Sequence, residues 1–190
     1  MAGTQLASAA APSASTLREQ LQAGRRELRA RYSADGKVQN VLRQHRLLID
    51  RTLRRIWAEA ALPRTLTLAA VGGYGRGELF PHSDVDLLII LPGDPDAGLK
   101  SKLEALIGTL WDAGLEPGHG VRTIAECLSE AAKDITVQTS LLEARWLAGS
   151  RSLFSEFTRS MRDQLDPQAF FRSKRLEQVQ RHGKHQDSPY

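Results

Sequence analysis

The stretch that decides the fold is Val71-Gly-Gly-Tyr-Gly-Arg-Gly-Glu-Leu-Phe-Pro-His-Ser-Asp-Val-Asp-Leu-Leu-Ile-Ile-Leu91. Four of the six residues from 72 to 77 are glycines, aspartates follow at positions 84 and 86, and five apolar residues run from 87 to 91. Such a glycine-rich turn adds little to a hydrophobic core, but it lets backbone N–H groups approach an anion closely. The combination therefore predicts a phosphate site beside a buried strand.

Two common phosphate loops are excluded by their spacing. A dinucleotide-binding fingerprint counted from Gly73 requires a sixth-position glycine, where this chain has Glu78. A Walker loop counted from Gly72 finds Gly77 in place, but Glu78 stands where the lysine is required. The loop must bind phosphate in another way.

The two aspartates indicate a metal site. If Asp84 to Leu91 is a strand, residues i and i+2 share a face about 7 Å apart, so Asp84 and Asp86 point the same way. Two carboxylates on one face repel each other unless a cation lies between them. Because Mg²⁺ prefers oxygen ligands and leaves positions to water and phosphate, we expect it here, with Arg76 and the loop amides on the triphosphate.

The rest of the chain predicts helices around a small sheet. Helical periodicity, capping patterns and apolar runs predict helices over 16–32, 37–62, 97–113 and 134–147, strands over 66–71 and 84–91, an extended piece over 115–122, a capping box at Thr123, and a last helix starting at Asp166-Pro167. The expected organisation is a disordered tail over 1–15, N-terminal helices over 16–62, a catalytic domain over 63–150 and a helical extension over 151–190.

Composition limits the class of protein. The 190 residues are 41% hydrophobic and 25% charged, which is ordinary for a globular protein. No apolar run reaches the ~18 residues that a membrane span needs, and the N-terminus lacks the features of a signal peptide. The single Cys127 cannot form an internal disulfide. We therefore expect a cytoplasmic protein without a membrane partner.

Basic residues are concentrated at the N-terminus. Residues 1–63 carry 11 Lys/Arg against 5 Asp/Glu, a net of +6, whereas residues 64–190 carry 15 against 17, a net of −2. This excess could serve nucleic-acid binding, but no aromatic residues are interleaved with the charges. A solvated helix face is the preferred interpretation, and a nucleic-acid partner the alternative.

Several motifs together resemble a known family. Gly72-Gly73 followed after ten residues by Asp84-Val85-Asp86 is similar to the signature of the DNA polymerase β type nucleotidyltransferase superfamily. More narrowly, the chain resembles the N-terminal domain of bacterial PII uridylyltransferase/uridylyl-removing enzymes through Val71-Gly-Gly-Tyr-Gly-Arg-Gly-Glu-Leu-Phe-Pro81, Ser83-Asp-Val-Asp-Leu-Leu88, Trp111-Asp112, Gly118-His-Gly-Val-Arg-Thr123 and Leu141-Leu-Glu-Ala-Arg145.

The resemblance implies both an α+β fold, with a small mixed sheet flanked by helices, and an activity. It implies transfer of UMP from UTP to a tyrosine of the nitrogen regulatory protein PII, with release of pyrophosphate and a need for Mg²⁺. The residues that it implies are the metal ligands Asp84 and Asp86 and the nucleotide contacts Gly72, Gly73, Arg76 and Ser83. The superfamily also implies a third acid, for which Glu143 is the first candidate and Glu116 the second.

The chain departs from this family in length. Such enzymes continue into a His-Asp hydrolase domain and regulatory domains, whereas no histidine here is followed by aspartate. The expectation is therefore a transferase half alone. Two alternatives stay open: adenylyl transfer to glutamine synthetase or another hydroxyl compound, and a nucleotide-sensing module without catalysis.

Overall fold

The computed structural model describes residues 14–184, which form two compact units. The helical unit takes the residues up to Leu62, Leu79–Val85 and Asp96–Pro117. The sheet unit takes Pro63–Glu78, Asp86–Pro95 and the chain from Gly118 onward. The predicted disordered tail lies outside the described residues, except for residues 14 and 15 at the start of the first helix.

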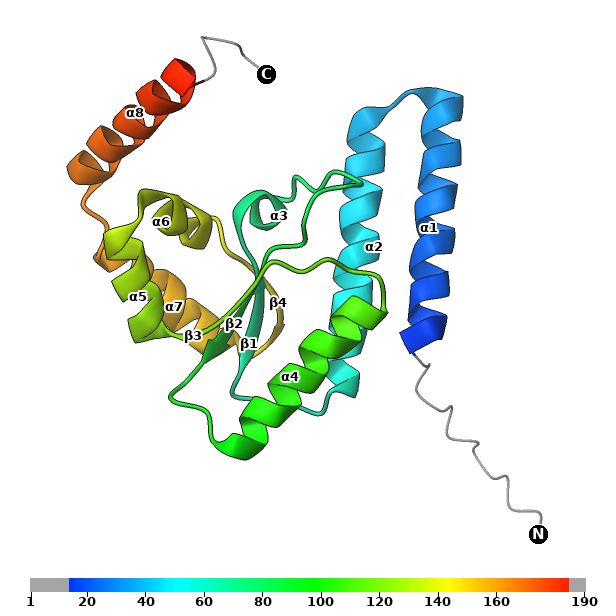
Figure 1. Cartoon of the computed structure of the whole chain (residues 1–190), viewed down its shortest axis with the longest axis horizontal. Helices are drawn as coiled ribbons and strands as arrows, with labels where there is room; N and C mark the ends of the chain where they lie inside the picture. The colour runs from blue at the N-terminus through cyan, green and yellow to red at the C-terminus, as the bar shows by residue number, and fades with distance from the viewer. Residues whose placement is uncertain (1–13, 185–190) are drawn as a thin grey trace. The chain divides into compact units, whose positions relative to one another are not determined.

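The helical unit consists of α1 (Ala14–Asp35), α2 (Val38–Glu59) and α4 (Ala97–Asp112). Figure 1 shows α1 and α2 side by side as an antiparallel hairpin. Their apolar side chains recur at steps of three and four, which places them on one face of each helix. The unit's buried residues include Leu17, Leu21, Ile49, Leu53, Ile56, Leu103, Leu106 and Leu110. All three helices were predicted from this periodicity, within three residues at each end.

The sheet unit is built on four strands in the order β3-β2-β1-β4. These are β1 (Thr67–Ala70), β2 (Leu87–Leu91), β3 (His119–Thr123) and β4 (Arg145–Gly149). β1 pairs antiparallel with β2 and β4, whereas β3 runs parallel to β2. The predicted α+β class with a small mixed sheet is confirmed.

Five helices complete the sheet unit: α3 (Gly72–Arg76), α5 (Ile124–Lys133), α6 (Ile135–Leu142), α7 (Arg151–Asp163) and α8 (Pro167–Lys184). Side-chain caps set several helix starts. Thr123 and Glu126 form the predicted capping box of α5, and Asp166 accepts hydrogen bonds from the backbone N–H groups of Gln168 and Ala169 at the start of α8.

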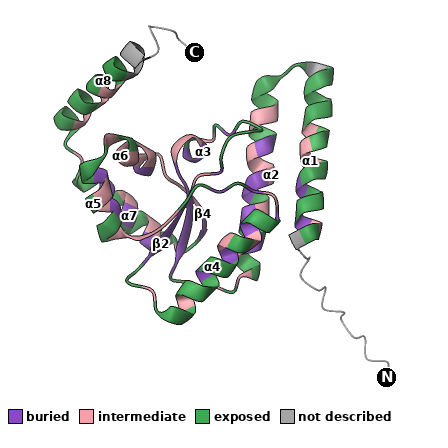
Figure 2. Ribbon diagram, viewed as in Figure 1, coloured by how far each residue is buried: buried purple, intermediate pink, exposed green. Residues whose placement is uncertain are grey.

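The core of the sheet unit joins one face of the sheet to α5, α6 and α7. Its buried members are Ala69, Val71, Leu88, Ile90, Cys127, Ala131, Leu141, Leu153, Phe157 and Met161. Figure 2 shows β2 in the colour of buried residues, and all five of its residues are buried, as its unbroken apolar run predicts. Burial raises the pKa of the Cys127 thiol to about 11.

The structure corrects three local predictions. The helix predicted over 134–147 ends at Leu142, and Arg145–Gly149 is instead β4, because these residues pair with the edge of β1. β2 begins at Leu87, so both aspartates precede the strand. The glycine-rich segment, expected to be a loop, forms the short helix α3.

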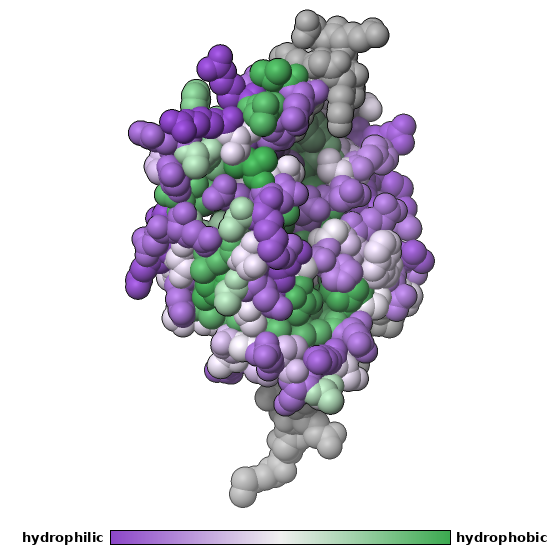
Figure 3. All heavy atoms as spheres, turned by 60° about the vertical axis from the view of Figure 1, so that its left-hand side comes forward, coloured by the Kyte–Doolittle hydropathy of each residue, from purple (hydrophilic) through white to green (hydrophobic). Residues whose placement is uncertain are grey.

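In residues 14–184 no helix combines the length and apolar character needed to cross a membrane. On the face shown in the space-filling view of Figure 3, hydrophobic side chains gather in several groups among hydrophilic ones. The largest exposed apolar side chains include three on α8, namely Phe171, Leu176 and Val179.

Candidate active site

A cavity of about 370 Å³ lies in the sheet unit, where β1 ends and β2 begins. Its walls come from the end of β1, the start of β2, β3 and α6. The residues that line it include Val71, Asp86, Gly118, His119, Arg122 and Ser140. The cavity therefore combines a carboxylate, a guanidinium and a hydroxyl with nearby glycines.

Backbone hydrogen bonds hold Asp86 at this cavity from both sides. Its carbonyl accepts a bond from the N–H of Val71 at 3.1 Å. The next N–H, of Leu87, donates to the carbonyl of Gly118 at 2.7 Å. The segment just before β2 is thus tied to the end of β1 on one side and to the start of β3 on the other, which fixes the direction of the Asp86 side chain.

Two glycines leave room for the Asp86 carboxylate. A Cβ on Gly118 would collide with its Oδ1, and a Cβ on Gly72 would lie 3.5 Å from Oδ2 and 3.3 Å from the hydroxyl oxygen of Ser140. Gly72 also has φ +57°, a conformation that side chains with a Cβ rarely adopt. The site therefore depends on bare backbone around one half-buried acid.

This donor set suits a hard divalent cation with few protein ligands. Asp86 is the one carboxylate in the cavity lining, and within the described range no group of three or more His, Cys, Asp or Glu side chains gathers into a metal centre. An oxygen ligand with open space beside it fits Mg²⁺, which keeps several positions for water and phosphate, better than Zn²⁺, which needs three or four protein ligands.

Asp84 belongs to the helical unit, one residue before the boundary between the two units. It is exposed, the next residue Val85 is 3% exposed, and Asp86 is half-buried. Both aspartates precede β2, so their arrangement on one face of a strand stays a prediction. Ser83 is exposed and its N–H donates to the carbonyl of Phe80, closing a turn in front of Asp84.

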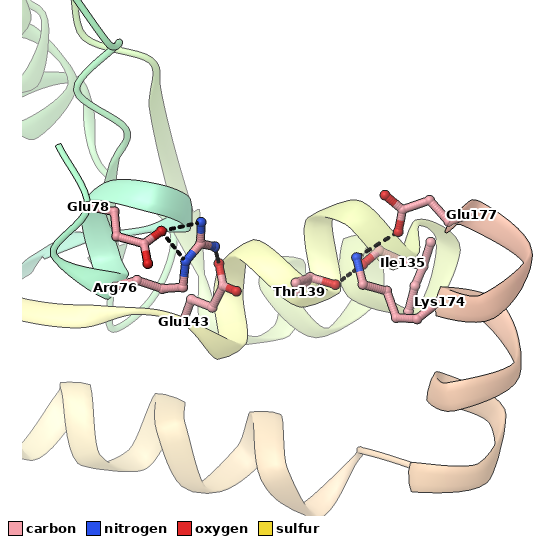
Figure 4. Close-up of polar contacts among 7 residues, drawn as sticks. All are labelled: Arg76, Glu78, Ile135, Thr139, Glu143, Lys174 and Glu177. Atoms are coloured by element: carbon pink, nitrogen blue, oxygen red, sulfur yellow. Dashed lines mark hydrogen bonds and ion pairs between the residues drawn. The ribbon is translucent and has the colours of Figure 1, made fainter. Parts of the chain in front are cut away.

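Arg76 is held by two glutamates, as Figure 4 shows. Its Nη1 donates to Oε2 of Glu143 at 2.5 Å, and its Nε donates to Oε2 of Glu78 at 3.0 Å. The hydrogen bond to Glu78, together with Glu143, raises the pKa of Arg76 above its ordinary value. Glu143, the first candidate for the third acid, is the C-cap residue of α6, and its carboxylate faces the guanidinium.

Glu116 is exposed and lies in the helical unit, where its carbonyl accepts from the N–H of Val85. His119 and Arg122 line the cavity. Tyr74 is 1% exposed with the Arg145 guanidinium 5.2 Å from its ring centre, so it is a packing residue and is not available to stack on a base.

Comparison with known proteins adds the family. Residues 51–142 match the family model described as "Nucleotidyltransferase domain". The chain contains a nucleotidyltransferase domain. The matched range contains both aspartates, the α3 glycines and the cavity described above.

Sequence relatives of this nucleotidyltransferase chain are long enzymes. It is 53% identical over 174 residues to the bifunctional uridylyltransferase/uridylyl-removing enzyme of Bordetella avium (strain 197N), covering 92% of this chain and 20% of that protein. It is 49% identical over 182 residues to the enzyme of the same name from Burkholderia orbicola (strain AU 1054), covering 96% and 21%. The chain thus spans about a fifth of the curated relatives it matches.

A solved toxin–antitoxin structure with AMP-PNP is also similar to the nucleotidyltransferase chain. The TM-score is 0.41 at 11% identity, and the match covers 69% of this chain and 98% of that one. A likeness of this size carries no argument about the site.

Three contributors to the nucleotidyltransferase site were missed by sequence reasoning. Thr136 and Ser140 line the cavity from α6, and Gly118 makes room for Asp86. The i, i+4 spacing of the two hydroxyl residues places them on one helix face. That spacing was a usable signal for the α6 pair, whereas the role of Gly118 follows only from the pairing of β3 with β2.

Proposed function

We propose that this chain transfers UMP from UTP to a tyrosine hydroxyl of the PII signalling protein, releasing pyrophosphate, in the cytoplasm. The observation that carries the proposal is the Asp86 carboxylate held between Gly72 and Gly118. This carboxylate occurs in a chain that shares about half of its aligned residues with enzymes named uridylyltransferase/uridylyl-removing. The choice of UTP and of PII rests on those relatives.

Asp84 and Asp86 are the proposed ligands of Mg²⁺. When bound, such an ion neutralises charge on phosphate oxygens and lowers the pKa of a nearby hydroxyl. Their contribution is two oxygen ligands separated by one buried residue, Val85, which anchors the segment. Asp86 comes just before β2, where backbone hydrogen bonds to the end of β1 and the start of β3 hold the segment, and Asp84 precedes it, just after the turn.

The glycine segment and Arg76 are the proposed triphosphate contacts. Gly72 and Gly73 present backbone without side chains at the start of α3, and Ser83 adds a hydroxyl in the turn before Asp84. Arg76 supplies a permanent charge with several donors in one plane, which suits phosphate oxygens. The protein's part in the reaction is therefore to position the nucleotide and balance its charge.

Glu143 acts through Arg76 in this proposal, as a positioning residue. Arg76→Gln is expected to raise the KM for UTP about tenfold or more, since hydrogen bonds to charged groups are worth about 1.5–3 kcal/mol. Glu143→Gln should also raise the KM for UTP. The KM of the double variant should be no higher than that of Arg76→Gln alone. Steady-state kinetics at varied UTP measures all three.

The matched control is Glu156→Gln on the exposed face of α7, which should leave the KM unchanged. A Glu143→Gln variant with wild-type KM and a kcat reduced a hundredfold would instead identify Glu143 as the third acid at the reacting atoms.

The nucleotide and the acceptor are tested together. The chain is incubated with PII, Mg²⁺ and each of the four labelled nucleoside triphosphates, and PII is analysed by mass spectrometry. UMP on a tyrosine, lost on chelation of the metal, is the expected result. Equal use of ATP would contradict the uridylyl assignment, and nucleotide binding without any product would favour the sensing module.

A further inference from the structure

A second cavity, of about 490 Å³, lies within the helical unit. α1 and α2 form its walls, and the segment Leu79–Val85 closes it with Pro81 and His82. Leu28 and Val41 contribute apolar surface. None of the catalytic candidates lines this cavity, so its chemistry is separate from that at Asp86.

The charged residues in the lining are all basic. Arg25, Arg26 and Arg29 come from α1, and the lining contains no carboxylate. Among the described residues, none of these three arginines forms a salt bridge, whereas Arg31 and Arg55 on the same hairpin pair with Glu27 and Glu59. Burial lowers the pKa of Arg25, and the negative charge of Glu116 offsets this only in part. Arg25 is half-buried, whereas Arg26 and Arg29 are exposed. Partial removal of a guanidinium from water without an ion pair costs free energy, which a bound anion would offset.

His45 supplies an independent sign of a ligand. It is 2% exposed, and its Nδ1 lies 3.2 Å from the carbonyl oxygen of Leu79. That carbonyl can only accept, so Nδ1 carries the proton and donates. The other ring nitrogen, Nε2, is buried and has no hydrogen-bond partner in residues 14–184. An unpaired buried polar atom costs free energy, which a ligand in this cavity would recover.

We propose that this cavity binds the phosphate group of a small molecule. Two or three guanidiniums on one helix face offer paired N–H donors to phosphate oxygens. When it is protonated, His45 on α2 adds an Nε2–H donor. Burial lowers the pKa of His45, the hydrogen bond to Leu79 raises it in part, and Arg25 and His82 lower it further. A bound anion would raise this pKa. Leu28, Val41 and Pro81 offer apolar contact to an organic body attached to the phosphate.

The position of the cavity links such a ligand to the segment that carries Asp84. Pro81 and His82 stand three and two residues before Asp84. A phosphate bound between these residues and α1 would restrain the segment that carries Asp84. This consequence rests on the proposed function, but the binding itself does not.

The test is titration calorimetry of the whole chain with inorganic pyrophosphate, in buffer with a chelator so that no metal–nucleotide complex forms. We expect saturable binding by the wild type, and at least about tenfold weaker binding by Arg25→Gln and by Arg29→Gln. Arg43→Gln removes the same charge from an exposed position of α2 outside the cavity, and should bind as the wild type does. Circular dichroism checks the fold of each variant.

Three further measurements test the proposal. Nitrogen NMR of the His45 ring should show its pKa rise when pyrophosphate binds, and Asp86→Asn should bind pyrophosphate normally, which separates this cavity from the catalytic one. Titration with phosphate, UMP and UTP then shows whether the cavity prefers a free phosphate or a phosphate that belongs to a nucleotide. Absence of wild-type binding at millimolar pyrophosphate, or equal weakening by Arg43→Gln and Arg29→Gln, would overturn the proposal.

Discussion

Asp86→Asn is expected to lower the rate of UMP transfer by about 10²–10³-fold, the range seen when a group that balances transition-state charge is removed. Asparagine has nearly the shape of aspartate, so it should fit between Gly72 and Gly118. Thermal unfolding should therefore change little while metal binding is lost. Transfer assays with varied Mg²⁺ measure the first effect, and broadening of the Gly72 and Gly118 amide signals by Mn²⁺ measures the second.

Asp94→Asn is the matched control. Asp94 is exposed in the turn after β2, and its substitution removes the same charge as Asp86→Asn. It should retain full activity and full Mn²⁺ broadening. Asp84→Asn should behave like Asp86→Asn if the two acids share an ion. Wild-type transfer by both site variants would show that these carboxylates do not hold the metal.

Gly118→Ala is the second variant with a large expected effect, about 10²-fold on transfer, since displacement of a catalytic group by ~1 Å can cost this much. The added methyl group would occupy the place of the Asp86 Oδ1. The backbone cannot easily retreat, because the carbonyl of Gly118 accepts the hydrogen bond from Leu87. The carboxylate must therefore turn away from its position. Kinetics and Mn²⁺ affinity both report this.

Gly93→Ala tests whether the effect is steric. A Cβ at Gly93 would have no neighbour within 4 Å, and the residue lies in an exposed turn. This control should leave transfer and metal affinity unchanged. Unaltered activity of Gly118→Ala would mean that the Asp86 side chain adopts another position during catalysis.

Much of the architecture could be predicted from local patterns. The apolar run of β2 and the periodicity of α2 each indicate one structure, and capping residues such as Thr123 mark helix starts. β4 could not be predicted in this way. Arg145–Gly149 follows Leu141, Leu142 and Ala144, which favour a helix, and only pairing with the edge of β1 makes it a strand.

The site divides in a similar manner. Asp86 and Gly72 could be proposed from spacing because the chemistry demands oxygen ligands and bare backbone close together in sequence. The Arg76–Glu143 contact joins residues 67 positions apart, so no local pattern indicates it. The cavity at His45 likewise depends on how α1, α2 and residues 79–85 fold together.

The division of the chain into two units limits how it can be dissected. The backbone passes from one unit to the other five times, after residues 62, 78, 85, 95 and 117. No single cut can release either unit intact. Expression from Pro63 onward would strip α4 of the helices it packs on and leave Leu103, Leu106 and Leu110 facing water. Shortened forms of this protein should therefore be made by trimming its two ends, never by removing the helical hairpin.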